Sequence, residues 1–257
     1  MVLKYLQIIQ TIGLFLIPSF ILSYLFNGSI KSLFDYKIKP GIVSICILLL
    51  VMITSIPVIN YLVDLNSNIL FPKLLKPIEL WMRESEDNAA KITEAFLKVY
   101  TIKGLLFNIF LIGVLPSLGE ELIFRGILQR IFIDWTKNIH VGILISAFIF
   151  SAIHLQFYGF LPRFLLGAFF GYLLQWSGTI WLPIFAHFIN NTVSVIVSYL
   201  INIKAINGTI ENFGSDTSTY LYAVLSLIIA LGLIFALHKI EKQNKIYQKE
   251  KCKTYEV

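Results

Sequence analysis

The sequence predicts an all-α protein: a polytopic transmembrane helix bundle of seven to eight spans with one amphipathic surface helix. Of its 257 residues, 57% are hydrophobic and only 14% are charged, and the mean hydropathy is +0.77. One soluble core cannot bury this much apolar surface. The apolar residues also gather in runs long enough to cross a bilayer, which takes about 20 residues per helix. These observations place the chain in a membrane.

Seven apolar segments define the predicted spans. They are residues 5–26, 41–63, 104–132, 141–157, 161–178, 181–201 and 219–238. The first is too long for the apolar part of a signal peptide and lacks a small-x-small cleavage site, so we interpret it as a retained span. The third contains Pro116 and Gly119. This pair predicts either one kinked span or two pieces, which is why the count is seven or eight.

A polar insertion at residues 64–103 separates the second and third spans. Within it, residues 81–100 carry apolar side chains on one helical face, and Glu94 precedes Lys98 by four positions. The pattern predicts an amphipathic helix that lies on the membrane surface or caps the bundle. A plain connector is the alternative.

The distribution of lysine and arginine predicts the orientation of the bundle. These cations lie near the ends of the first, third and last spans: Lys31, Lys37, Lys39, Arg130, Lys137, Lys239, Lys242, Lys245, Lys249, Lys251 and Lys253. The positive-inside rule then predicts a multi-pass protein of the cell membrane with a cytoplasmic C-terminus and, for seven spans, an external N-terminus. The tail would also contact membrane lipid.

The chain is expected to form one integral membrane domain with three parts. Residues 1–103 hold the N-terminal spans and the polar insertion, residues 104–201 hold the core with the polar motifs, and residues 202–257 hold the last span and the basic tail. The net charge of +6 does not indicate a nucleic-acid partner, because the cations flank apolar runs and form no single face. Cys46 and Cys252 fit neither a disulfide framework nor a metal motif.

Two neighbouring acids, Glu120 and Glu121, lie in the third span, and Arg125 follows Glu121 by four residues. A charge at the bilayer centre costs about 2.5–3.5 kcal/mol on insertion scales, so a cluster of three indicates a functional site. Arg125 can hold Glu121 ionised on one helical face, while Glu120 points elsewhere as a candidate general base. The alternative is a buried ion pair that orients helices.

Polar side chains interrupt two further spans. His154 follows Phe150 by four residues near the end of the fourth span; taken singly, it is more readily a hydrogen-bonded packing residue than a ligand. In the sixth span His187 and Asn191 share one face at i and i+4, with Asn190 beside them. Such groups must point into the bundle, since an unsatisfied polar group in hydrocarbon costs several kcal/mol, of order 2–7.

The fifth span carries a weaker signal. Gly167 and Gly171 form a small-xxx-small pattern, which favours close helix packing. We place Arg163, at the start of this span, at the membrane interface, with an inward role as the alternative.

Taken together, these spans supply two carboxylates, two imidazoles, an amide and a guanidinium. This inventory suits activation of a water and stabilisation of an oxyanion. Alternatively, Glu120, His154 and His187 could bind Zn²⁺ through oxygen and nitrogen. Motifs of zincins, Gly-x-Ser-x-Gly hydrolases and P-loop nucleotide-binding proteins are absent from the sequence.

Three motifs now appear in order on successive apolar segments. They are Glu-Glu-x-x-x-Arg at 120–125, Phe-x-x-x-His at 150–154 and His-x-x-x-Asn at 187–191. This set resembles that of the CPBP family, which comprises type II CAAX prenyl endopeptidases, bacteriocin-processing and self-immunity proteins, and lysostaphin-resistance-like proteins. The resemblance covers residues 104–201; the remaining spans are similar to bacterial members in layout only.

The resemblance implies an intramembrane endopeptidase whose catalytic core is residues 104–201. Glu120 would activate water, His154 would help to hold it, and His187 and Asn191 would stabilise the oxyanion. Arg125 would orient the pair of Glu120 and Glu121. The family has been described both as metalloproteases and as metal-free glutamate enzymes, so Zn²⁺ and a metal-free mechanism both stand. The substrate would be a membrane-associated peptide or protein, of prenylated or another type.

Two other functional classes compete with the protease hypothesis. One is a non-catalytic immunity or assembly factor that uses the same fold to bind a partner. The other is a proton- or ion-coupled transporter, but transporters usually contain paired broken helices in two related halves, and the sequence shows one break without a counterpart. For a protease, water should reach Glu120 through a polar cavity that opens toward the basic side of the membrane.

Overall fold

The computed structural model describes residues 2–27, 40–69, 71–216 and 218–254, and over these residues it contains helices and loops but no strand. The helices in chain order are α1 (Val2–Thr11), η1 (Ile12–Leu16), α2 (Ile17–Asn27), α3 (Ile42–Thr54), α4 (Ile56–Ser67), η3 (Lys73–Leu75), α5 (Lys76–Leu97), α6 (Ile102–Asn108), η4 (Ile109–Val114), α7 (Leu115–Ile123), η5 (Phe124–Leu128), α8 (Gln129–Thr136), α9 (Ile139–Ala152), α10 (Phe160–Ser177), α11 (Trp181–Asn202), η6 (Gly208–Asn212) and α12 (Tyr220–Thr254). The predicted all-α class is confirmed.

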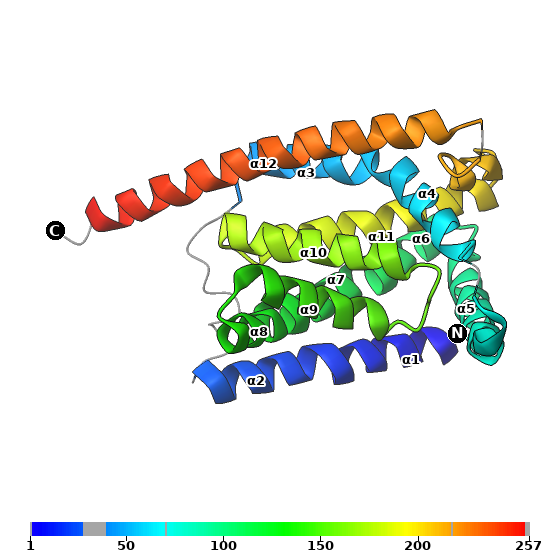
Figure 1. The fold of residues 1–257 in the computed structure, drawn as a ribbon, viewed down its shortest axis with the longest axis horizontal. Helices are drawn as coiled ribbons and strands as arrows, with labels where there is room; N and C mark the ends of the chain where they lie inside the picture. Colours follow the sequence, from blue (N-terminus) through cyan, green and yellow to red (C-terminus); the bar gives the residue numbers. More distant parts are fainter. Residues whose placement is uncertain (1, 28–39, 70, 217, 255–257) are drawn as a thin grey trace.

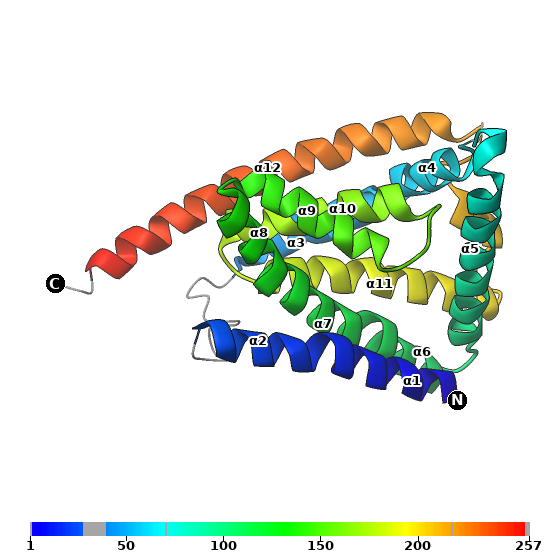
Figure 2. The same cartoon turned by 60° about the horizontal axis from the view of Figure 1, so that its bottom comes forward.

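The long helices run back and forth along one axis of the molecule (Figure 1). The helical run from α1 to α2 forms one side of the bundle, and α12 lies against α3 on the opposite side in both views (Figures 1 and 2). Between these sides lie α7, α10 and α11, the helices that carry most of the polar motifs. The two termini lie at opposite ends of the bundle.

The outer surface of the bundle is apolar. Large hydrophobic side chains with more than half of their surface exposed occur on several helices, among them Ile9, Leu106, Phe148, Leu221 and Phe235. Polar side chains are buried instead, including Glu121, Arg125 and Gln129 at 0–1% exposure. A soluble protein has the reverse arrangement, so this distribution identifies a multi-pass membrane protein.

Fewer helices qualify as membrane spans, judged by their length and composition, than the sequence predicts. Four helical segments are long and apolar enough to cross a membrane: Leu3–Phe26, Ile102–Thr136, Trp181–Asn202 and Tyr220–Asn244. Helices α3 and α4 make a fifth if they count as one bent span, and α9 is a shorter apolar helix. The predicted count of seven to eight spans is therefore not confirmed.

The third predicted span is one continuous helical run from Ile102 to Thr136, so of the two alternatives the single span holds. Two π-helical stretches, η4 and η5, flank α7 and accommodate Pro116 and Gly119 within this run. The bent helix pair lies elsewhere: α3 and α4 meet at an angle of 41° at Ser55, just before Pro57. Pro57 has no backbone N–H to continue α3, and the resulting break was not predicted from the sequence.

Helix α5 is the amphipathic helix that the insertion predicts, although it begins at Lys76 and ends at Leu97. It lies across the end of the bundle, roughly perpendicular to the long helices, and so caps it (Figure 2).

The opposite end of the bundle carries the Lys137 loop and the C-terminal tail. Lys31, Lys37 and Lys39 lie outside the described residues, and the cytoplasmic C-terminus stays a prediction. Cys46 is a free thiol, and the Cys252 side chain also lies outside the description.

Candidate functional site

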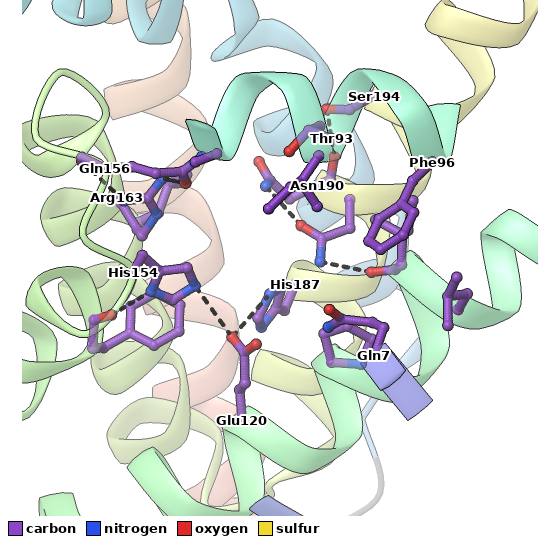
Figure 3. A pocket seen from close by; sticks show the side chains of 18 of the residues that line it. Gln7, Thr93, Phe96, Glu120, His154, Gln156, Arg163, His187, Asn190 and Ser194 are labelled. Carbon is purple, nitrogen blue, oxygen red and sulfur yellow. Dashed lines mark hydrogen bonds and ion pairs between the residues drawn. The ribbon is translucent and has the colours of Figure 1, made fainter. Parts of the chain in front are cut away.

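A cavity of about 570 Å³ lies between α5, α7, α10 and α11 and brings several polar motifs together (Figure 3). Its lining includes Glu120 from α7, His154 from the loop after α9, and His187 and Asn191 from α11. Glu121 and Arg125 are not in the lining; they lie buried next to His187, at 0% and 1% exposure. The predicted site residues therefore form one cluster: some line the cavity, and Glu121 and Arg125 are buried behind them.

The cavity lies at the α5 end of the bundle. Ala89, Ile92, Thr93 and Phe96 of α5 contribute to its lining. The basic tail is at the other end (Figure 1). That the cavity opens toward the basic side of the membrane stays a prediction.

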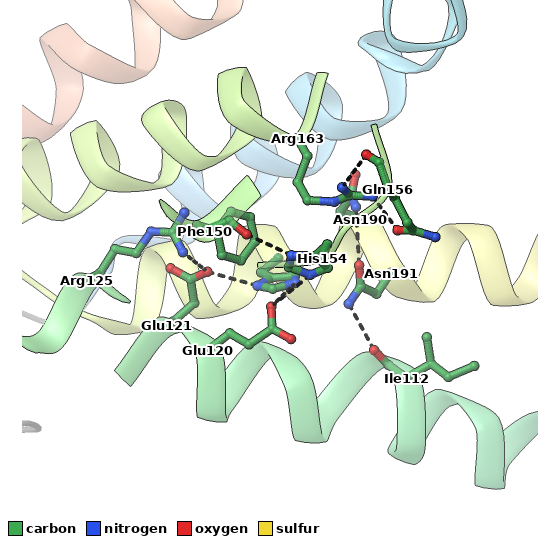
Figure 4. Close-up of polar contacts among 11 residues, drawn as sticks. Ile112, Glu120, Glu121, Arg125, Phe150, His154, Gln156, Arg163, Asn190 and Asn191 are labelled. Carbon is green, nitrogen blue, oxygen red and sulfur yellow. Dashed lines mark hydrogen bonds and ion pairs between the residues drawn. The ribbon is translucent and has the colours of Figure 1, made fainter. Parts of the chain in front are cut away.

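A buried chain of polar contacts leads from Arg125 to the cavity (Figure 4). Arg125 Nη1 donates to Glu121 Oε1 at 2.9 Å, and His187 Nδ1 lies 2.9 Å from the same oxygen. An ionised carboxylate only accepts hydrogen bonds, so Nδ1 of His187 carries the hydrogen. In the neutral imidazole, Nε2 then presents its lone pair to the cavity. The ion pair foreseen as an alternative exists, and it orients a histidine of the site.

The His154 imidazole is oriented in the same way. Its Nδ1 lies 2.7 Å from the backbone oxygen of Phe150, one helical turn earlier. A carbonyl oxygen can only accept, so Nδ1 is the protonated nitrogen and Nε2 is the nitrogen that faces the cavity. His154 is therefore oriented by the last turn of α9, which ends just before it.

The two imidazoles converge on one atom of Glu120. Oε2 of Glu120 lies 3.9 Å from His154 Nε2 and 3.8 Å from His187 Nε2, too far for direct hydrogen bonds. This oxygen is buried and has no hydrogen-bond partner among the described residues. Three acceptor atoms thus face a common point, an arrangement that a water with its two hydrogens or a cation would satisfy.

Aromatic rings hold both imidazoles in place. Phe150 meets His154 and His187 edge to face, with ring centroids 5.1 Å and 5.9 Å apart. The Arg125 guanidinium lies over the Phe150 ring at 4.5 Å. On the other side, Phe170 stacks on His187 at 5.5 Å. Phe170 was not predicted as a site residue, since one more phenylalanine in an apolar span carries no distinguishing signal.

The Gly167–Gly171 pattern has the packing role that the sequence predicts, with a polar addition. Arg125 Nη2 donates to the backbone oxygen of Gly167 at 3.0 Å, and Gln129 Nε2 donates to that of Gly171 at 3.2 Å. Arg125 and Gln129 are one helical turn apart, as are the two glycines. Gln129 is fully buried and was not foreseen, although a glutamine four residues after a buried arginine is a signal of a repeated contact.

A substitution of Gly171 with alanine should destabilise the bundle. A Cβ there would lie 2.6 Å from Gln129 Oε1 and 2.8 Å from Ile143 Cγ2. Overpacking of this kind typically costs 1–3 kcal/mol, so we expect the thermal unfolding midpoint in detergent to fall by about 5 °C. Gly232→Ala in α12 is the control, because a Cβ there meets no atom within 4 Å. Equal midpoints for the two variants would contradict this account of the packing.

Asn191 supports the helix that carries Glu120. Pro116 lacks the N–H that would pair with the carbonyl of Ile112, and Asn191 Nδ2 donates to that carbonyl at 2.9 Å. The Asn190 amide in turn donates to Asn191 Oδ1 at 3.3 Å. One N–H of Asn191 is thus committed to the backbone beside the site.

Asn191→Leu should leave the partly buried Ile112 carbonyl unsatisfied and lower the free energy of unfolding by about 1–3 kcal/mol. Asn190→Leu is the matched control, because it removes only the longer contact to a side chain. We expect the thermal midpoint of Asn191→Leu to be the lower of the two. The reverse order would show that Asn191 does not stabilise the run around Pro116.

Arg163 lines the cavity, in keeping with the inward alternative, and its depth relative to the membrane interface stays a prediction. Its guanidinium bonds to Gln156 of the His154 loop: Nη1 donates to the backbone oxygen at 3.3 Å and Nη2 to Oε1 at 2.5 Å. The loop before α10 thereby holds the guanidinium at the cavity.

The donor types of Glu120, His154 and His187 fit Zn²⁺, since each presents a carboxylate oxygen or an Nε2 lone pair to the same point. Glu121 would be the carboxylate that orients the His187 ligand. Within the described residues no three His, Cys, Asp or Glu side chains already lie at mutual coordination distances. Metal binding would therefore require the three side chains to draw together.

Known proteins resemble the region around this site. Residues 102–193 match the family described as "Type II CAAX prenyl endopeptidase Rce1-like". The "Putative membrane peptidase YdiL" of Bacillus subtilis (strain 168) is 34% identical over 115 residues, which cover 45% of this chain and 44% of that protein. The "Uncharacterized protein YpbD" of the same organism is 29% identical over 100 residues, 37% of this chain and 48% of that protein.

The chain spans less than half the length of these two curated relatives. No solved structure matches it. The matched region contains Glu120, Glu121, Arg125, His154 and both site residues of α11. The resemblance to the CPBP family, with its type II CAAX prenyl endopeptidases, is thereby confirmed for residues 102–193.

Proposed function

We propose that the protein is an intramembrane endopeptidase that hydrolyses a peptide bond of a membrane-associated substrate with a water activated by Glu120. One observation carries the proposal: the buried, unpartnered Oε2 of Glu120 faces the Nε2 atoms of two imidazoles whose orientations are fixed. The family match and the relative named as a membrane peptidase support it.

The proposed reaction assigns a step to each side chain. Glu120 takes a proton from the water held against His154, and the water oxygen adds to the substrate carbonyl carbon. The resulting oxyanion accepts hydrogen bonds from His187 and Asn191. The C–N bond then breaks, and the proton on Glu120 passes to the leaving amine.

His187 can donate to the oxyanion only when Nε2 also carries a hydrogen. Glu121 already accepts a hydrogen bond from Nδ1 and would balance the charge of that imidazolium. Arg125 acts through Glu121 as a positioning residue, since its guanidinium is buried behind the carboxylate and is not part of the cavity lining.

A zinc form of the mechanism uses the same residues. Glu120, His154 and His187 would hold Zn²⁺, which would polarise the water and the substrate carbonyl. Metal analysis of the purified protein, with cleavage measured before and after 1,10-phenanthroline, separates the two forms. Full cleavage by metal-free protein would establish the glutamate mechanism, whereas loss of cleavage with restoration by Zn²⁺ would establish the metal one.

The substrate would be a peptide or protein segment at the membrane, with prenylated peptides as one class. The cavity suits such a segment, because apolar residues such as Leu111, Leu166 and Phe170 share its lining with the hydrophilic Thr93 and Asn190. Polar groups can pair with the backbone of a peptide while the apolar lining contacts its side chains.

The proposal can be tested before a substrate is known. Membranes from cells that express the wild-type chain or Glu120→Gln are compared by mass spectrometry of protein termini. We expect new termini in membrane proteins with the wild type only. Asp134→Asn, an exposed acid on α8, is the control and should give the wild-type pattern. Identical termini for wild type and Glu120→Gln would instead favour the non-catalytic immunity or assembly factor.

A further inference from the structure

Arg163 gives the proposed substrate cavity a positive group that catalysis does not use. It is the only lysine or arginine in the lining of this cavity among the described residues. Figure 3 shows it together with Gln156 above His154, with Glu120 below the imidazole. The guanidinium therefore belongs to the same space as the reacting groups but stands apart from them.

No carboxylate in the described part of the chain forms an ion pair with Arg163. The two acids that interact with it electrostatically are Glu86 and Glu120, and neither reaches ion-pair distance. Glu86 Oε2 accepts a hydrogen bond from the backbone N–H of Tyr158 at 3.1 Å. Arg125, by contrast, has its own carboxylate at 2.9 Å.

The Arg163 guanidinium is nevertheless held in place. Both of its described hydrogen bonds go to one residue, Gln156, through the backbone oxygen and Oε1. A guanidinium has five N–H donors, so three remain for a ligand. The planar fork is the geometry that binds a carboxylate with two parallel hydrogen bonds.

We propose that Arg163 forms a subsite for a carboxylate of the substrate, either the C-terminal carboxylate of a peptide or an Asp or Glu side chain. The inference relies on the proposed function in taking the cavity as the place where the substrate binds. A partly buried guanidinium without an ion pair pays a desolvation penalty, and a carboxylate ligand would offset it. Arg163 would then determine specificity without taking part in the chemistry.

Binding of short peptides tests the subsite without relying on hydrolysis. The full chain with Glu120→Gln is placed in phosphatidylcholine nanodiscs, so that the peptides stay intact. The probes are a trileucine with a free C-terminal acid, the same peptide as an amide, and a Leu-Leu-Glu amide, each with a neutral coumarin label at the N-terminus. Fluorescence anisotropy gives Kd after subtraction of binding to empty nanodiscs.

We expect at least one acidic probe to bind about tenfold more tightly than the trileucine amide, and Arg163→Gln to abolish that difference. Preference for the free acid identifies a C-terminal carboxylate, and preference for the Glu peptide identifies a side chain. Lys103→Gln, an exposed cation on α6 that is absent from the cavity lining, is the control and should keep the preference.

Two results would overturn the subsite: equal affinities of all three probes for the Glu120→Gln protein, or an acid preference that survives Arg163→Gln. Both are independent of catalysis. A failed subsite would leave Glu120-dependent cleavage intact, and a failed protease proposal would leave the carboxylate preference measurable. Arg163→Lys adds a further check, because it keeps the charge but loses the fork and should retain only part of the preference.

Discussion

Glu120→Gln should lower kcat by about 10²–10⁴-fold, the range that a general base contributes, while the protein still inserts and folds. The substitution is nearly isosteric. The oxygen it affects makes no hydrogen bond within the described structure, so no stabilising contact is lost. The measurement is the cleavage rate of a substrate identified by terminus profiling, with purified protein in nanodiscs, together with the thermal unfolding midpoint.

His187→Ala should reduce cleavage at least as strongly, and it should also affect stability. It removes the group that faces Glu120 and also the partner of the buried Glu121. The comparison of the two variants is informative: both lose activity, but only His187→Ala is expected to lower the unfolding midpoint. Wild-type cleavage rates in both variants would reject Glu120 as the base and His187 as the oxyanion donor.

Arg125→Leu should have the largest effect on stability of any single change at this site. It leaves the Glu121 carboxylate, at 0% exposure, without its guanidinium, and it empties the space between the Phe150 ring and the Gly167 carbonyl. Breaking a buried pair by removing one partner costs about 3–5 kcal/mol. We expect the thermal midpoint in detergent to fall by roughly 10 °C, with loss of cleavage.

A double variant tests the physical reason for that loss. Removing both charges with Arg125→Leu and Glu121→Leu should recover part of the stability, because no uncompensated charge then remains buried. Cleavage should stay lost, since His187 is no longer oriented. If the double variant is as unstable as the sum of the two single variants, the ion pair is not the source of the effect.

The site residues could be predicted because few hydrophilic residues interrupt the apolar spans. In a chain of this hydropathy, Glu120, Glu121 and Arg125 have no inexpensive location other than a shared interior, and the same holds for His154 and His187. Local spacing also predicted one contact, between Arg125 and Glu121 at i and i+4. This contact lies within one helical run, where residue number fixes geometry.

Contacts outside a single helix could not be predicted from the sequence. Gln129 with Gly171 and Asn191 with Ile112 join residues of separate helices, whose relative placement depends on how the helices pack. Arg163 with Gln156 joins the start of α10 to the loop before it, and helical spacing does not fix the geometry of a loop. The effect of a proline was ambiguous for the same reason. Pro57 accompanies a 41° break, whereas Pro116 lies in a continuous helical run in which a neighbouring amide takes up the freed carbonyl.

The sequence by itself determined that the chain is helical, that it lies in a membrane and which polar residues must avoid lipid, because the cost of exposing charge or backbone to hydrocarbon depends on composition and order alone. Only the tertiary structure decided that α5 caps the cavity, that two Nε2 atoms face one oxygen of Glu120, and that Arg163 shares this space. These features depend on distances of a few ångströms between separate helices, and such distances follow from side-chain packing across the whole bundle.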